Sequence, residues 1–139
     1  MCSFCESMDP VSVLDYRYGT EPMRTVFRAN SYLKYLLEVE TTLAEVQESK
    51  KIIPKGTSKN IRNGIKLVKR ERVEEIEAEI NHDVMAVVKA LEEQSGSSGK
   101  WIHFGATSYD IVDTARALQH KAAIELLEKA INSLIKSMA

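Results

Sequence analysis

The feature that most constrains the fold is the apolar periodicity at the end of the chain. Apolar side chains recur there at intervals of 3, 4, 3 and 4, as Ile124, Leu127, Ile131, Leu134 and Met138. This heptad spacing places them on one stripe of an α-helix. Ile111, Ala115, Leu118 and Ala122 extend this surface upstream. The whole stripe then spans roughly 30 residues, or ~45 Å, and no glycine, proline or cap ends it. We therefore expect partner helices, and expect this chain to be the N-terminal piece of a larger protein.

Helical spacing also dominates upstream, whereas strand signals are weak throughout. The expected helices are 20–48, which begins at Thr20-Glu21-Pro22, a short one at 58–63, 67–93, and 107–139. The third helix carries an apolar stripe of Val73, Ile76, Ile80, Val84, Val87 and Leu91, and a flexible loop should follow at 94–99. The sequence therefore predicts an all-α fold.

Composition excludes several classes of protein. The chain has 139 residues, 44% of them hydrophobic and 28% charged, which suits one globular domain. A net charge of −1 leaves no basic footprint for nucleic acid. No apolar run could span a membrane and no signal peptide begins the chain, so we expect a cytoplasmic protein. Cys2 and Cys5 lack the second pair that a zinc site needs, so we expect reduced thiols in a loose tail and no metal.

The segment from Lys100 to Ala115 carries the strongest functional signal. Gly105 permits a tight turn, and Thr107 with Asp110 forms a T-x-x-D capping box that should begin the last helix. A helix N-terminus presents free N–H groups and a partial positive charge, which suit a carboxylate or a phosphate. From these residues alone, an ordinary capped helix and an anion site are equally good interpretations.

Three motifs resemble those of adenylosuccinate lyases, which belong to the fumarase/aspartase superfamily. Residues 105–115 are similar to the signature G-x-T-S-x-D-I-x-D-T-A. Arg17-Tyr18-Gly19 resembles an N-terminal Arg-Tyr element, and residues 75–84 resemble an E-I-E…H-D-V segment. The resemblance extends from about Val11 to the end of the chain. It implies an irregular leader (1–16), a helical N-terminal domain (17–106), and the truncated start of a central helical bundle (107–139), whose first long helix closes the chain.

The resemblance also implies an activity. Adenylosuccinate lyases eliminate fumarate from adenylosuccinate, giving AMP, and from the succinyl-carboxamide ribotide of purine biosynthesis. They are homotetramers whose active sites combine residues of different subunits, and they need no cofactor or metal. The implied partners are thus a small nucleotide substrate and further copies of the chain, with no nucleic acid and no membrane.

Two motifs that the family uses for proton transfer do not occur in this sequence. They are a T-H motif carrying the catalytic acid and an S-S-x-M-P-x-K-x-N-P loop carrying the catalytic base. We therefore expect this chain alone to be inactive and to supply substrate-binding residues. Two alternatives stay open: a carboxymuconate cycloisomerase-like member of the superfamily, which shares a similar signature, and a helical oligomerisation module that is not an enzyme.

The resemblance assigns roles to individual residues. Arg17 and Tyr18 would hold the AMP part of the substrate, and Thr107 and Ser108 would contact its succinyl carboxylate or nearby groups. The nucleotide end of the site would be lined by Asn81, His82 and Asp83. His82 and His103 could also assist catalysis. The bland alternatives are a surface arginine with a docking tyrosine, and a packed loop histidine at position 103.

Periodicity on the expected helix 67–93 adds two specific expectations. Asp83 should face with the apolar stripe, as a buried carboxylate, and the alternatives are a solvated stripe edge or a structural pair with a lysine or arginine. His82 should align with Glu75 and Glu79 on an acidic face. On helix 20–48, Glu40 lies within an apolar stripe, so we expect a structural acid with a partner.

Overall fold

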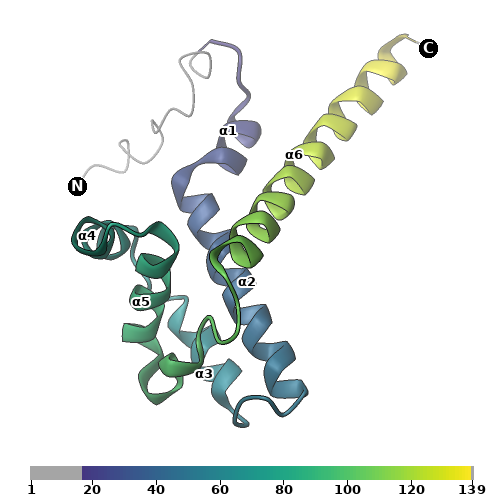
Figure 1. Cartoon of the computed structure of the whole chain (residues 1–139). Helices are drawn as coiled ribbons and strands as arrows, with labels where there is room; N and C mark the ends of the chain where they lie inside the picture. Colours follow the sequence, from purple (N-terminus) through teal and green to yellow (C-terminus); the bar gives the residue numbers. More distant parts are fainter. Residues whose placement is uncertain (1–16, 139) are drawn as a thin grey trace. The chain divides into compact units, whose positions relative to one another are not determined.

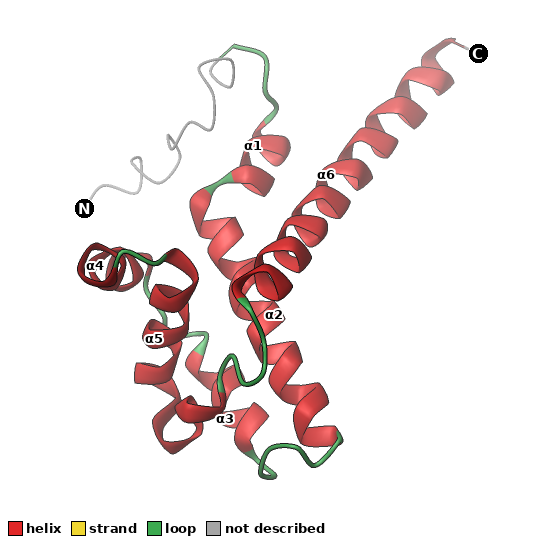
Figure 2. Cartoon of the chain, viewed as in Figure 1, coloured by secondary structure: helices red, strands yellow, loops and turns green. Residues whose placement is uncertain are grey.

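The computed structural model describes residues 17–138, and this part of the chain contains helices and loops but no strand (Figures 1 and 2). The all-α prediction is thus confirmed, whereas the leader with Cys2 and Cys5 lies outside the described residues. The elements are α1 (Glu21–Phe27), α2 (Ala29–Ser49), α3 (Thr57–Gly64), α4 (Arg70–Ile80), α5 (Asp83–Ser95), the 3₁₀ helix η2 (Gly96–Trp101) and α6 (Ser108–Met138).

The chain forms two compact units. One comprises Leu33–Ala115, and the other comprises the described parts of Met1–Tyr32 and Arg116–Ala139. The boundaries fall inside α2 and α6, so both of these helices contribute to both units. The predicted domain division after residue 106 came from the family resemblance and not from compactness, so it differs from these units and stays a prediction.

Helix α5 organises the core of the unit Leu33–Ala115, because it packs against α3, α4 and η2. Leu91 of α5 and Ile61 of α3 are fully buried. The predicted apolar stripe is confirmed, since all of its side chains except Ile80 are buried. Apolar burial of this kind is the main source of stability for short helices.

The expected single helix 67–93 is wrong, because the chain breaks between α4 and α5. Asn81 has left-handed backbone angles (φ 53°, ψ 41°), and its N–H donates to the Glu77 carbonyl at 2.8 Å. Asparagine tolerates this conformation better than most residues and commonly ends helices. The imidazole of His82 then caps α5 by accepting the Met85 N–H at 3.3 Å. The apolar residues of the stripe are still buried together, because α4 and α5 pack against each other.

Two other helix predictions also need correction. The expected helix 20–48 is interrupted at Arg28, where ψ is 147° and the backbone is extended. The Ser31 hydroxyl donates to the Thr25 carbonyl at 2.6 Å, which replaces the bond that a continuous helix would make there. The expected flexible loop 94–99 is the end of α5 followed by η2, in which Gly99 is buried. A Cβ at Gly99 would lie 3.0 Å from the Glu92 carbonyl oxygen, so the close packing requires glycine.

Helix α6 confirms the long helix that was expected over residues 107–139. It begins at Ser108, and in the unit that contains its second part the Gln119 amide donates to the Val26 carbonyl at 2.9 Å. Further along, the heptad stripe is uncovered: its five side chains are between 53% and 79% exposed. We call these five residues, Ile124, Leu127, Ile131, Leu134 and Met138, the α6 seam.

Candidate functional site

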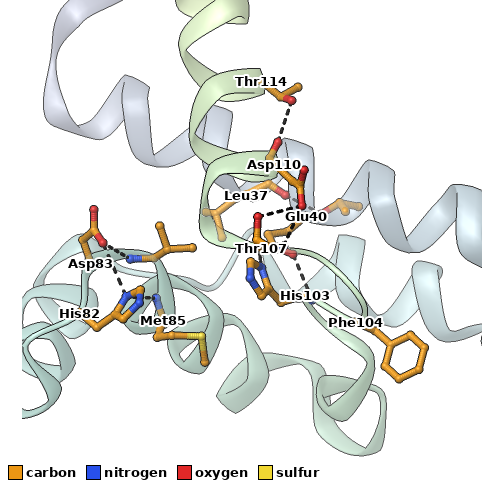
Figure 3. A network of polar contacts seen from close by, with 12 residues as sticks. Leu37, Glu40, His82, Asp83, Met85, His103, Phe104, Thr107, Asp110 and Thr114 are labelled. Atoms are coloured by element: carbon orange, nitrogen blue, oxygen red, sulfur yellow. Dashed lines mark hydrogen bonds and ion pairs between the residues drawn. The ribbon is translucent and has the colours of Figure 1, made fainter.

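The predicted capping box is present at the N-terminus of α6, which we call its mouth. The backbone N–H and the hydroxyl of Thr107 both donate to Oδ2 of Asp110, at 2.8 and 3.0 Å (Figure 3). These two bonds, with the N–H bond the larger cause, lower the pKa of the Asp110 carboxyl. Gly105, with φ of 70°, makes the turn before them. Thr107 is exposed and Ser108 is half-buried, so both hydroxyls belong to an open helix start.

His103 lies in the same loop and is held by a buried carboxylate of α2. The Glu40 side chain is 1% exposed; its Oε1 lies 2.6 Å from Nδ1 of His103, and its Oε2 accepts the His103 backbone N–H at 3.1 Å. The expectation that Glu40 is a buried acid with a partner is confirmed. Burial raises the pKa of Glu40, and the hydrogen bonds from His103 oppose that rise.

The loop that carries His103 is anchored to α2 a second time. The Gln47 amide donates to the Phe104 carbonyl at 2.6 Å, and the Phe104 ring meets Trp101 edge to face at 5.2 Å between centroids. His103 itself has a left-handed backbone, with φ of 60°. These contacts hold the segment between η2 and α6 in one conformation, and they fix where the mouth of α6 begins.

His82 and Asp83 form an exposed turn between α4 and α5. The expectation of a buried Asp83 on the apolar stripe is wrong, and the solvated alternative holds: its side chain is 75% exposed, and it accepts the Val84 N–H at 2.8 Å. The expected alignment of His82 with Glu75 and Glu79 is also wrong, because α4 ends before His82. Nδ1 of His82 lies 3.6 Å from Oδ1 of Asp83. The break at Asn81, itself exposed, is what presents both side chains to solvent.

The structure groups some predicted residues and leaves others apart. Figure 3 shows His103 beside Thr107 and Asp110, and the His82–Asp83 turn as a second group. No hydrogen bond joins these two groups among the described residues. Arg17 and Tyr18 belong to the other compact unit, in the turn before α1, where Tyr18 is 77% exposed. Their role therefore stays a prediction, as do those of Asn81, His82, Asp83, Thr107 and Ser108.

Sequence reasoning singled out Glu40 and His103 but did not pair them. The two residues are 63 positions apart, and the signal available was a charged residue within an apolar stripe. A shallow depression of about 650 Å³ lies elsewhere, between the end of α2 and the start of α3, and none of the predicted site residues lines it. Within residues 17–138, no group of three acidic, histidine or cysteine side chains could hold a metal ion. No helix in that range has the length and apolar character to cross a membrane.

Comparisons with known proteins connect this geometry to a family. A family model described as Lyase matches residues 16–139. Adenylosuccinate lyase of Pyrococcus horikoshii is 48% identical over 134 residues, which are 93% of this chain and 30% of that protein. Adenylosuccinate lyase of Methanocaldococcus jannaschii is 46% identical over 127 residues, or 89% of this chain and 28% of that protein.

A solved structure agrees with the sequence comparisons. The crystal structure of fumarate lyase from Mesorhizobium sp. BNC1 has a TM-score of 0.76 and 30% identity, over 86% of this chain and 30% of that chain. The chain thus spans less than a third of the length of these relatives. The family model covers nearly the whole chain, and the resemblance that the three motifs predicted is confirmed: the chain belongs to the lyase family.

Proposed function

We propose that the complete protein is an adenylosuccinate lyase. It would eliminate fumarate from adenylosuccinate, giving AMP, and from the succinyl-carboxamide ribotide, as a cytoplasmic enzyme of purine biosynthesis. The observation that carries the proposal is that the family match and the adenylosuccinate lyase relatives cover the segments holding both exposed groups of Figure 3. A nucleotide substrate with two succinyl carboxylates and a phosphate needs several hydrogen-bond donors, and those groups provide hydroxyls, backbone N–H groups and imidazoles.

Each group would have its own task. Ser108 and Thr107 would bind a succinyl carboxylate, with the free N–H groups of the first α6 turn adding to the Ser108 hydroxyl. The Thr107 hydroxyl donates to Asp110 in this structure and would turn toward the substrate on binding. Because Asp110 already places a negative charge at this mouth, the anion would approach from the Ser108 side. His82 and Asp83 would bind the nucleotide end with Asn81, and Arg17 and Tyr18 would hold the AMP part. Arginine suits this task, since its planar fork binds phosphate through two bonds.

This chain would bind substrate without completing the chemistry. The T-H motif and the serine loop of the family do not occur in its sequence. The complete protein would form a homotetramer through helices such as α6, whose exposed seam is the observation that favours self-association. Burying five large apolar side chains in a helical bundle would contribute several kcal/mol for each seam.

Fumarate release from adenylosuccinate by the complete protein tests the proposal. The change Ser108→Ala should lower kcat/KM by about tenfold or more, because one hydrogen bond to a charged group is lost. The control is Ser97→Ala, at an exposed serine of η2, which should leave kcat/KM unchanged. The 139-residue chain by itself should release no fumarate.

Two results would contradict the proposal. If the complete protein released no fumarate from adenylosuccinate, the substrate assignment would be wrong; cyclisation of a carboxymuconate would then favour the cycloisomerase-like alternative. If Ser108→Ala and Ser97→Ala had equal activity, Ser108 would not be part of the substrate site.

A further inference from the structure

We propose that Glu40 is a positioning residue that acts through His103. Its carboxylate accepts the Nδ1–H of the His103 ring, which fixes the ring's orientation and tautomer. In the neutral ring the other nitrogen, Nε2, is then a hydrogen-bond acceptor, suited to a hydroxyl or N–H donor of the substrate. The substrate part of this inference rests on the proposed function; the pairing and the tautomer do not.

The first argument is the geometry of the pair. Both carboxylate oxygens of Glu40 are used by one residue: Oε1 faces Nδ1 at 2.6 Å, and Oε2 accepts the backbone N–H at 3.1 Å. A backbone N–H can only donate, so Oε2 must act as an acceptor. An ionised carboxylate accepts at both oxygens, which makes Nδ1 the protonated nitrogen of the neutral ring. A histidine's second nitrogen is commonly set by the bond that the first one makes.

The second argument is burial. Glu40 is 1% exposed, and every hydrogen bond that its side chain makes among the described residues goes to His103. An isolated buried carboxylate is costly, whereas a glutamine or a leucine would fill the same space of α2 without that cost. The His103 side chain keeps 13% exposure, and its Nε2 has no hydrogen-bond partner within residues 17–138. The buried acid thus uses one face of the ring and leaves Nε2 available.

The third argument is the surroundings of His103. Its loop is fixed to α2 by Gln47 as well, so Glu40 is not needed merely to attach the loop. The ring lies beside Thr107 and Asp110 in Figure 3, at the mouth that the proposed function assigns to the substrate. A fixed Nε2 acceptor at the helix start that also carries the Ser108 hydroxyl would give this end of α6 both a donor and an acceptor.

The test is to measure the tautomer of His103 in the 139-residue chain by ¹⁵N NMR, in alkaline buffer where histidine rings are neutral. The chain has three histidines, so His82 and His120 serve as internal references. In the unmodified chain we expect the His103 proton on Nδ1. In Glu40→Gln the amide oxygen must face the backbone N–H, so the amide NH₂ faces Nδ1 and the proton moves to Nε2. The signals of His82 and His120 should not change.

A proton on Nε2 of His103 in the unmodified chain would overturn the inference, because Glu40 would then be the donor. That single measurement decides the question if Glu40→Gln does not fold. A tautomer that is the same in Glu40→Gln would also overturn it.

Activity of the complete protein separates positioning from simple support. Glu40→Gln should lower kcat/KM by about tenfold or more in the unmodified background and change it little in a His103→Asn background, because Glu40 acts through His103. Asparagine is chosen because it tolerates the left-handed backbone of position 103. Equal losses in both backgrounds would indicate a structural role only. If no variant, including the unmodified protein, cleaved adenylosuccinate, the proposed function and the substrate part would fall, while the NMR result would still decide the tautomer.

Discussion

The break between α4 and α5 leads to a prediction that separates the observed fold from the single helix that the periodicity favours. Asn81 is exposed and has φ of 53°. The test is to replace it with alanine in one variant and with glycine in another. If position 81 is left-handed, alanine is strained there and glycine is not. If the segment 70–95 were one helix, alanine would be the best residue and glycine the worst. The two structures therefore predict opposite rankings.

The magnitudes are large enough to measure. A left-handed conformation costs an ordinary L-residue about 1–2 kcal/mol, and asparagine less, so Asn81→Ala should lose about 1 kcal/mol of folding free energy. Asn81→Gly should be close to neutral, because the relief of strain offsets the entropy of glycine in the unfolded chain. In a continuous helix, Asn81→Ala would instead gain about 0.5 kcal/mol and Asn81→Gly would lose a few tenths.

Urea unfolding followed by circular dichroism measures these differences, with thermal unfolding as a second probe. For a chain of this size, 1 kcal/mol corresponds to roughly 4 °C in Tm. The expected order of stability is glycine and asparagine above alanine, with similar m-values for all three proteins. An alanine variant more stable than the unmodified chain, with a glycine variant less stable, would refute the break and with it the exposed His82–Asp83 turn.

Three further predictions concern the core, pH and association. Leu91→Ala should cost about 2–5 kcal/mol in urea unfolding, because it opens a cavity at a fully buried side chain, whereas Leu67→Ala, at a 60% exposed side chain, should cost far less; equal losses would contradict the assigned core. The N–H groups of Gly56 and Ser58 donate to the Glu48 carboxylate and lower its pKa. The ionised Glu48 therefore stabilises the folded chain fully above its unfolded-state pKa, and this contribution is lost as pH falls through its folded-state pKa. The protection of the Gly56 and Ser58 amides against hydrogen exchange, relative to their intrinsic rates at each pH, should therefore fall in acid, and in Glu48→Gln it should lose this acid dependence; an unchanged profile would contradict the role of Glu48. In sedimentation, Leu127→Glu should weaken self-association through the α6 seam, whereas Lys129→Glu, at an exposed position outside the seam, should not; equal association of the two variants would indicate another interface.

Local patterns in the sequence predicted the helices better than their breaks. The capping box of Thr107 and Asp110 and the α6 seam depend on residues three or four positions apart, so they could be read directly. The stripe of α4 and α5 was also correct, but it hid the break at Asn81. When two short helices fold back and pack together, both apolar faces point inward, and the spacing along the sequence shows no interruption.

Contacts between distant segments could not be predicted in this way. Glu40 was recognised as a paired acid because a carboxylate in an apolar stripe needs a partner. Its partner, 63 residues away, is set by the packing of the 101–107 loop on α2. Periodicity describes which side of a helix is buried, and it does not say what lies against that side.

Two features that the sequence did not predict, the break at Asn81 and the pairing of His103 with Glu40, belong to the candidate site. Both involve an unusual backbone conformation. Among the described residues, Lys51, Asn81 and His103 are the non-glycine positions with positive φ. Lys51 follows the end of α2, where a left-handed residue is common. Asn81 likewise ends α4, and it precedes the His82–Asp83 turn, whereas His103 lies in a loop and belongs to the other group proposed to bind substrate. Asparagine accepts this conformation locally, whereas at His103 the contacts of its loop with Glu40 and Gln47 accompany the left-handed backbone. The break at Asn81 exposes the His82–Asp83 turn, and the backbone at His103 places its ring against Glu40 with 13% exposure. Periodicity along the sequence contains neither the turn nor the loop contact, which is why both had to come from the structure.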